Sequence, residues 1–453
     1  MLVNFSVQNF LSFNKETTFS MESGRVSKKT DHLCLFPDCK KSLLKFAAIF
    51  GKNGAGKSNF IRAVAVLQNY ITKGILPRKA DTYWCRLYDE NEKLPTIFKV
   101  SFITNNKLYS YTLSVVLTEG KIVMEKLENI VGNRHIVLFC KEDENAEYVF
   151  HRNLRGKTDD VTVLARNYNM NGKPFLYNIN HNTPGFFSNN MQAEVLLIVF
   201  RWFADTLEVI FPDQPLQETS LLQYNHSKDN IAKLLNQFAT GIVEIKLEPT
   251  TKEKVYENLD DKTRQQIEFE TQLFGPIIKK NISEIAKNDD FPSIVTRHRR
   301  NIFIINYEQD GELHFYSLIF VHKTGDKCID FHIQNESDGT HRLFQLLEIL
   351  ICNKEKVFVM DEINRSLHPK LTVEFIKKFF ESSFFQHIQL ITTTHETRIM
   401  THDLVRRDEL WLADTNEDAS TNLFSLESKQ VRIDKVLEEN YLEGIWGGVP
   451  RFE

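Results

Sequence analysis

The sequence predicts an α/β fold in which a mixed N-terminal sheet and a parallel sheet are separated in the chain by an inserted, mostly helical subdomain. Two observations indicate the sheets: apolar alternation near the N-terminus, and strand–helix–strand alternation after about residue 340. A third observation is the helix-like, strongly charged character of much of the chain between them. We therefore expect an N-terminal lobe at 1–160, an insertion at 161–320 and a C-terminal lobe at 321–453.

Apolar spacing defines the expected elements in order. Val3, Phe5 and Val7 alternate with polar residues, as in a half-buried strand. A helix should follow Lys57, because apolar residues recur there every three or four positions. The other expected strands lie at 42–50, between 96 and 150, from about 312, at 356–360 and at 388–394. The other expected helices lie at 189–211, 251–288, 340–352 and 370–380.

Composition limits the classes of protein to which the chain can belong. Of its 453 residues, 42% are apolar and 26% are charged, which is typical of a folded globular protein and excludes a disordered one. The net charge of −4 is too weak to attract nucleic acid as a whole, although the basic run 297–300 leaves a local contact open. No apolar run approaches the roughly 20 residues that span a bilayer, and no signal peptide is recognisable, so we expect a cytoplasmic protein without membrane contact.

A glycine-rich loop at residues 51–58 reads GKNGAGKS and matches G-x-x-x-x-G-K-[ST] at every fixed position. Glycines let the backbone wrap around phosphate oxygens, and the N–H groups at the start of the following helix point at the anion. Lysine neutralises the β- and γ-phosphates, and the hydroxyl of the last residue reaches Mg²⁺. The phosphate-binding residues predicted here are Gly51, Asn53, Gly54, Ala55, Gly56, Lys57, Ser58 and Asn59.

Two carboxylates follow the apolar strand at 356–360, in the string KVFVMDE. Asp361 is expected to hold Mg²⁺ together with Ser58, and Glu362 to act as the general base for an attacking water. Lys57 and Asp361 are about 300 residues apart, much farther than a minimal nucleotide-binding domain requires. The site should therefore be assembled from both ends of the chain across an insertion.

With these motifs, the chain resembles the ABC-type ATPase heads of the SMC, RecF and OLD (overcoming lysogenization defect) proteins. More closely, it is similar to the nuclease-less AAA-type ATPases of bacterial anti-phage defence and abortive-infection operons. Four further strings carry the resemblance: NFLSF at 9–13, ESDGT at 336–340, DEINRSLHP at 361–369 and TTTHE at 392–396. The ending YLEGIWGGVP at 441–450 is also similar to that of the group.

The resemblance implies a head-to-head dimer in which ATP and Mg²⁺ lie between two protomers. It implies that Ser337, Gly339 and Thr340 of one protomer cover the γ-phosphate bound by the other. Arg365 would lie at the dimer seam, and His395 would sense the γ-phosphate. Ser12 would contact the nucleotide, but Leu11 stands where the group often carries a basic residue. An acidic nuclease constellation is not recognisable after His395, so OLD nuclease activity is not implied.

The motifs favour a regulatory ATPase that dimerises, or forms a larger assembly, around ATP. The resemblance implies that it controls a separate effector, such as a nuclease or toxin, in anti-phage defence. A DNA-binding ATPase of repair or chromosome maintenance, as in RecF or SMC, remains an alternative. A scaffold that binds ATP without useful turnover is a third. The sequence does not distinguish ATP from GTP, because it contains no recognisable base-reading motif.

Overall fold

The computed structural model describes residues 1–26, 28–155, 160–168, 172–183, 185–212, 227–288, 293–298, 301–308, 310, 312–382, 387–429 and 437–450. The chain forms two compact units, each built from more than one segment. The first unit contains 1–214, 354–364 and 385–453, and the second contains 215–353 and 365–384. Within the described residues, no helix is both long and apolar enough to cross a membrane.

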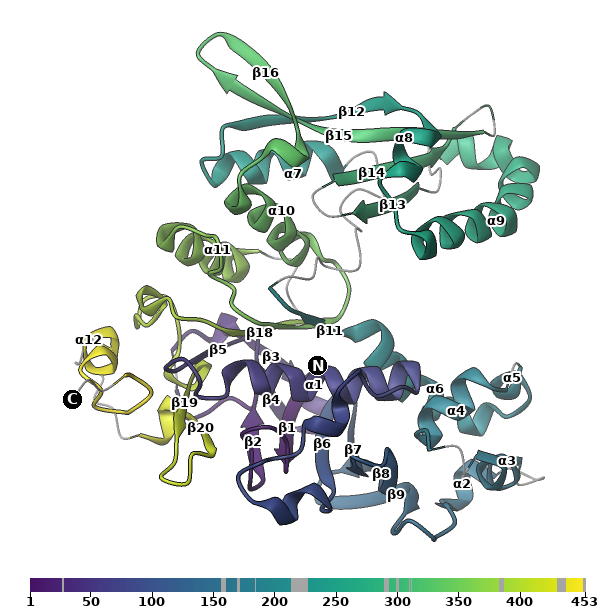
Figure 1. The fold of residues 1–453 in the computed structure, drawn as a ribbon, viewed down its shortest axis with the longest axis vertical. Helices are drawn as coiled ribbons and strands as arrows, with labels where there is room; N and C mark the ends of the chain where they lie inside the picture. The colour runs from purple at the N-terminus through teal and green to yellow at the C-terminus, as the bar shows by residue number, and fades with distance from the viewer. Residues whose placement is uncertain are drawn as a thin grey trace. The chain divides into compact units, whose positions relative to one another are not determined.

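The first unit contains an antiparallel sheet with the strand order β10-β9-β8-β7-β6-β1-β2 (Figure 1). Hairpin connections join β6 to β9 in sequence, as the alternating pattern of 96–150 predicts. Its strands are β1 (Leu2–Gln8), β2 (Thr17–Ser20), β6 (Thr96–Thr104), β7 (Lys107–Val116), β8 (Lys121–Val131), β9 (Arg134–Lys141) and β10 (Val149–Phe150).

A second sheet of the same unit has the order β11-β17-β18-β5-β19-β20. Neighbouring strands from β11 to β19 are parallel, and only β20 runs antiparallel. A small separate hairpin pairs β3 (Leu33–Phe36) with β4 (Lys41–Leu44). The strands of the parallel sheet are β5 (Phe46–Phe50), β11 (Leu207–Ile210), β17 (Lys356–Met360), β18 (Ile388–Thr393), β19 (Leu410–Thr415) and β20 (Thr421–Ser425).

Helix α1 (Lys57–Lys73) connects the cores of the two sheets. Its Phe60 ring lies 5.6 Å from Phe5 on β1 and 5.1 Å from Phe19 on β2. Phe19 in turn lies 4.7 Å from Trp411 on β19. The remaining helices of this unit are α2 (Arg152–Arg155), α3 (Asp160–Tyr168), α4 (Phe175–His181), α5 (Phe186–Asn189), α6 (Glu194–Arg201) and α12 (Leu437–Leu442).

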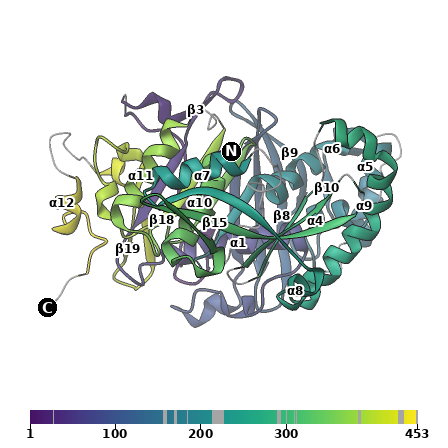
Figure 2. The same ribbon diagram turned by 90° about the horizontal axis from the view of Figure 1, so that it is seen from above.

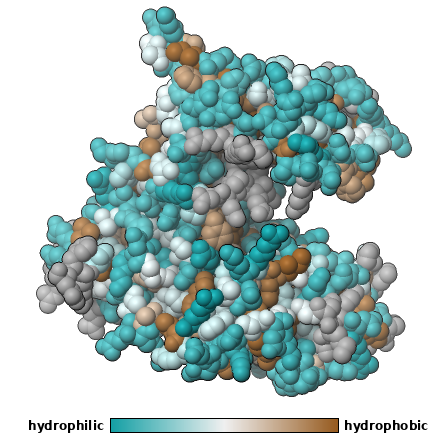
Figure 3. All heavy atoms as spheres, in the orientation of Figure 1, coloured by the Kyte–Doolittle hydropathy of each residue, from teal (hydrophilic) through white to brown (hydrophobic). Residues whose placement is uncertain are grey.

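The second unit combines helices with an antiparallel sheet of order β12-β15-β14-β13, to which β16 is added on β15. Its strands are β12 (Ile242–Thr250), β13 (Ser293–His298), β14 (Asn301–Tyr307), β15 (Leu313–Thr324) and β16 (Lys327–His332). Its helices are α7 (Ser227–Gln237), α8 (Lys252–Glu257), α9 (Asp261–Asn288), α10 (Asp338–Ile351) and α11 (Pro369–Glu381). Figure 3 shows apolar colour on the β15–β16 hairpin, where Ile329 and Phe331 are exposed.

The predicted α/β class with a parallel sheet is confirmed. The N-terminal sheet was expected to be mixed, but it is antiparallel throughout, because hairpins connect most of its strands. The insertion differs from the mostly helical subdomain expected, because β12 to β15 form a sheet within it. β12 pairs with β15 about 70 residues later, a long-range contact that local patterns do not reveal.

Two boundaries also differ from those expected. The predicted helix 189–211 is wrong at its end, because Leu207–Ile210 forms β11 and pairs in parallel with Val357–Met360. Short apolar runs of this kind suit a buried strand as well as a helix, and the partner strand decides. In addition, α3 to α6 belong to the first unit, whereas α10 and α11 belong to the second, so the units do not follow the 161–320 limits.

Gln389 joins the two sheets of the first unit through a buried side chain. Its Oε1 accepts a hydrogen bond from the Leu2 N–H at 2.6 Å, and its Nε2 lies 3.0 Å from the carbonyl oxygens of Leu2 and Leu44. Gln389→Leu should lower the free energy of unfolding by about 3 kcal/mol, because it leaves buried backbone groups without partners. Chemical denaturation measures this, with the exposed Gln265→Leu as the matched control. Equal losses in the two variants would contradict this role.

Candidate functional site

The phosphate-loop sequence connects β5 to α1 at the carboxyl edge of the parallel sheet. Gly51, Gly54 and Gly56 have φ angles of 154°, 78° and 95°, a region that favours glycine. A Cβ on Gly51 would lie 2.3 Å from the Ala413 carbonyl oxygen, so the loop approaches β19 too closely for any side chain there. Asn53 and Gly54 are exposed at the tip of the loop, and Ala55 is buried beneath it.

Lys57 is buried inside this loop, although it is the first residue of α1. Its Nζ donates hydrogen bonds to the carbonyl oxygens of Gly51 at 2.7 Å and Lys52 at 3.0 Å. Burial lowers the pKa of Lys57 to about 8, and the negative charges of Asp361 and Glu362 partly oppose this effect. The loop therefore encloses the Lys57 ammonium group, which interacts electrostatically with the carboxylates of Asp361 and Glu362.

Ser12 and Asn59, both expected to contact nucleotide, brace the loop through their side chains. Asn59 Nδ2 donates to Ser12 Oγ at 2.8 Å. Thr421, at the start of β20, places its Oγ1 2.7 Å from Ser12 Oγ and 3.0 Å from the Ala55 carbonyl oxygen. A Cβ on Gly56 would lie 2.0 Å from Thr421 Oγ1. The sequence did not indicate Thr421, because it belongs to no motif. It lies beside the loop only because β20 pairs with β19, which in turn pairs with β5.

Asp361 and Glu362 follow β17, and Thr393 at the end of neighbouring β18 holds both. Thr393 Oγ1 donates to Asp361 Oδ1 at 2.5 Å and accepts from the Glu362 N–H at 2.8 Å. Asp361 is 5% exposed, whereas Glu362 is half-buried with a φ angle of 52°. Thr393 therefore fixes the direction of the carboxylate that was expected to hold Mg²⁺. The TTTHE string contained Thr393, but only the strand register reveals this function.

His395 follows β18 and is exposed at the same edge of the sheet. Its backbone N–H donates to Asn364 Oδ1 at 3.4 Å, and Thr394 Oγ1 donates to the same oxygen at 3.0 Å. Desolvation lowers the pKa of His395, and the charge of Lys57 lowers it further, while Glu362 and Asp361 raise it. The charges of Lys57, Asp361 and Glu362 therefore all influence the protonation of His395.

The residues present fit a magnesium-bound triphosphate. Mg²⁺ prefers one or two protein oxygen ligands together with substrate phosphates. Ser58 in the first turn of α1 is half-buried and would supply one oxygen ligand, and the buried Asp361 carboxylate would supply the second. The described part of the chain contains no group of three or more His, Cys, Asp or Glu side chains that could hold a metal ion.

The second unit carries the ESDGT string at the beginning of α10. Ser337 is the N-cap, and its Oγ accepts a hydrogen bond from the Thr340 N–H at 3.1 Å. A Cβ on Gly339 would lie 3.0 Å from the Ser366 carbonyl oxygen, so this helix start packs closely against the turn that follows Arg365. Ser337 and Arg365 are exposed.

The structure thus brings the predicted site residues together in two groups. Lys57, Asp361, Glu362 and His395 share the carboxyl edge of the parallel sheet in the first unit. Ser337, Gly339 and Thr340 lie with the turn at Arg365 in the second unit. The contact of the second group with a triphosphate remains a prediction. Of the basic run 297–300, Arg299 and Arg300 lie outside the described residues.

Comparison with protein families gives one match that covers most of the chain. Residues 46–401 match the family described as "AAA domain, putative AbiEii toxin, Type IV TA system". This range begins with β5 and ends after His395, so it includes both groups of site residues.

The solved structures that are similar to this chain include two described as SMC heads. One, described as the SmcHead bound to the C-winged helix domain of ScpA, has 14% identity and a TM-score of 0.41, covering 94% of this chain and 99% of that chain. The other, the SMC head domain from Thermotoga maritima, has 10% identity and a TM-score of 0.33, covering 94% and 98%. No curated protein matches the chain.

The Thr393 hydroxyl provides a direct test of this site. Thr393→Val keeps the shape of the side chain but removes the donor to Asp361 and the acceptor for the Glu362 N–H. Losing such support for a metal ligand should reduce Mg²⁺-dependent ATP hydrolysis by about 10- to 100-fold. The neighbouring Thr392→Val is the matched control, because its hydroxyl bonds only the Thr393 carbonyl oxygen within the described contacts. If the two variants lose equal activity, Thr393 does not act through Asp361.

Proposed function

The chain belongs to the family described as "AAA domain, putative AbiEii toxin, Type IV TA system", and on that premise we propose that it is a regulatory ATPase. It binds ATP with Mg²⁺, hydrolyses it, and dimerises head to head around it. The observation that carries this proposal is the convergence of Lys57, Asp361, Glu362 and His395 at one sheet edge.

Each residue has a chemical task that follows from its surroundings. Lys57 exchanges the carbonyl oxygens of its own loop for phosphate oxygens, a charge-assisted bond in a buried place. Glu362 accepts a proton from the attacking water as the water oxygen bonds to the γ-phosphorus. The bond from that phosphorus to the β–γ bridging oxygen breaks, and ADP leaves. His395 reports whether the γ-phosphate is present.

The magnesium ion, when bound by Ser58 and Asp361, would neutralise charge that develops on the phosphates. Thr393 orients the Asp361 carboxylate for this task. In the second unit, the exposed Ser337 hydroxyl and the start of α10 offer hydrogen-bond donors to an anion. Because Ser337 and Gly339 lie at an exposed helix start, they can cover the triphosphate of a second protomer.

The biological role proposed here is control of a separate effector in anti-phage defence. The family description names a toxin of a toxin–antitoxin system, which supports this class of role. Nucleotide binding would close the dimer and hydrolysis would open it, so the effector is held or released in step with the nucleotide state. DNA-stimulated hydrolysis, measured on the full chain, would instead favour the repair class.

Two substitutions test binding and hydrolysis separately. Lys57→Ala should abolish nucleotide binding, because it removes the buried cation of the loop. Glu362→Gln should bind ATP with unchanged affinity but hydrolyse it at least about 100-fold more slowly, because the amide cannot accept the proton. Binding calorimetry and phosphate release measure the two effects, and light scattering should show a persistent dimer in Glu362→Gln with ATP. A Glu362→Gln variant that hydrolyses ATP at the parent rate would contradict the assignment of the base.

Mixing two inactive variants tests whether the site is shared. Lys57→Ala lacks a working loop, and Ser337→Arg blocks the α10 start, so neither should hydrolyse ATP alone. In a mixed dimer, one of the two sites would combine an intact loop with an intact Ser337. Each mixed dimer should therefore have about half the activity of a parent dimer, because one of its two sites is complete. If the mixture stays inactive, although the two variants bind each other in the presence of ATP, the trans arrangement is wrong.

A further inference from the structure

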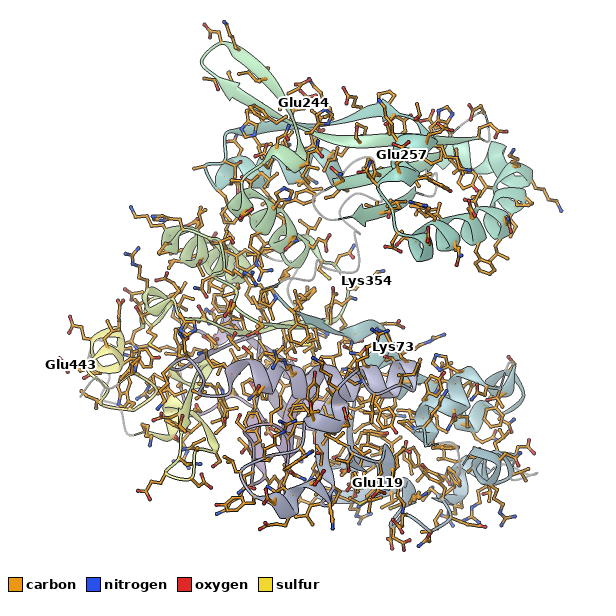
Figure 4. All side chains as sticks on the ribbon, viewed as in Figure 1. Lys73, Glu119, Glu244, Glu257, Lys354 and Glu443 are labelled. Atoms are coloured by element: carbon orange, nitrogen blue, oxygen red, sulfur yellow. The ribbon has the colours of Figure 1, made fainter. Side chains whose placement is uncertain are left out.

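The segment Leu437–Pro450, called here the 437–450 segment, packs against the phosphate loop within the first unit. Figures 1 and 2 both show α12, its first part, on the β19 side of this unit, and Figure 4 marks Glu443 just after α12. The Tyr441 side chain is 6% exposed, and its ring centroid lies 5.9 Å from that of Phe50, the residue before Gly51. The segment therefore reaches the strand that ends in the loop.

The Tyr441 hydroxyl donates a hydrogen bond to the Gly448 carbonyl oxygen at 3.1 Å. It also lies near enough to the Gly51 backbone for that group to lower the pKa of Tyr441, against the effect of burial. Burial raises the pKa of Tyr441 to about 12, so the hydroxyl keeps the proton that it donates. The Gly51 carbonyl oxygen is bound by Lys57 Nζ at 2.7 Å. Tyr441 and Lys57 therefore both hold the residue that begins the loop.

Two consecutive glycines allow this close approach. A Cβ on Gly448 would lie 3.7 Å from Gly51 Cα and 3.5 Å from the Ala413 carbonyl oxygen. A Cβ on Gly447 would lie 2.3 Å from Asp414 Oδ2, and Asp414 Oδ1 pairs with Lys52 Nζ at 3.6 Å. The φ angles of Gly447 and Gly448 are 81° and 76°. The backbone of the 437–450 segment thus lies directly beside the first residues of the loop.

The same segment also contacts the chain just after His395. Thr397 Oγ1 donates to Glu438 Oε1 at 2.6 Å. Thr397 lies two positions after His395, so Glu438 and Tyr441, less than one helical turn apart in α12, contact the His395 region and the loop respectively. This short helix therefore ties together two parts of the site that belong to different strands.

We propose that the 437–450 segment is a positioning element that holds Gly51 in place for the triphosphate and links the loop to the His395 region. Tyr441 is its central positioning residue. This inference rests on the proposed nucleotide binding and deepens it, since it assigns a task to residues outside the nucleotide-binding motifs. Gly51 keeps its position because the Tyr441 ring packs on Phe50 and the Gly448 backbone, held by the Tyr441 hydroxyl, lies against it, so the loop is preorganised before ligand arrives.

Tyr441→Phe tests the proposal, because it keeps the ring beside Phe50 and removes only the hydroxyl. Titration of the full chain with fluorescently labelled ATP and Mg²⁺ should show a Kd about 10-fold higher than that of the parent. Tyr148→Phe is the matched control. Tyr148 is also buried in the first unit, and its hydroxyl donates to Glu125 Oε2 at 2.6 Å, far from the loop in the antiparallel sheet region. It should lower Tm without changing the Kd.

Hydrogen exchange of the nucleotide-free chain provides a readout that does not depend on ATP. Amide exchange across 51–56 should be at least about 10-fold faster in Tyr441→Phe than in the parent, and unchanged in Tyr148→Phe. Faster exchange and weaker binding in Tyr441→Phe alone would support the proposal. Equal behaviour of the two variants in both measurements would overturn it. Faster exchange with no ATP binding by the parent would refute the proposed function but retain the positioning of the loop.

Discussion

The site depends on the parallel register of β17, β18 and β5. β5 is more than 300 residues before β17 and β18 in the chain. The parallel pairing aligns Met360 with Thr392 and Thr393 with Ile49. Because parallel strands end at the same edge, this register places Asp361 and His395 beside the loop that follows β5. The hydrogen bond from Thr393 to Asp361 then connects the end of β18 to the end of the neighbouring β17. Without this register the two halves of the motif set would be unrelated stretches of chain.

The division of tasks between the two units follows from the same construction. The first unit contains the loop, both carboxylates and His395, together with the residues that brace them, such as Thr421. The second unit contains Ser337 at an exposed helix start and the turn at Arg365. In the account proposed here, the first unit binds and cleaves the nucleotide, and the second covers the nucleotide of a partner. The two units are joined directly in the chain at this point, because Asn364 is the last residue of its segment in the first unit and Arg365 is the first residue of the next segment, in the second unit.

Local sequence patterns could predict much of this protein, and the misses have a common physical cause. The loop, the strand before Asp361 and the helix after Ser337 are short-range features, and the elements there match those expected from spacing and composition. The sheet of the second unit was missed because β12 finds its partner β15 only through the fold. Likewise Thr421 belongs to no motif, and the strings that contain Thr393 and Tyr441 do not indicate what these two side chains contact. Each becomes part of the site through a strand neighbour or a packed backbone, and no spacing rule contains that information.

We propose that Ser58 and Asp361 hold one shared metal ion on a bound triphosphate, and electron paramagnetic resonance of Mn²⁺ can show whether they do. Mn²⁺ replaces Mg²⁺ at such oxygen sites, and its binding in the presence of ATP can be titrated in the parent, Ser58→Ala, Asp361→Asn and the double variant. A shared ion predicts that each single change weakens binding by about 10-fold or more and that the double variant is little weaker than either. Independent, additive losses, or unchanged Mn²⁺ binding in Asp361→Asn, would contradict the account.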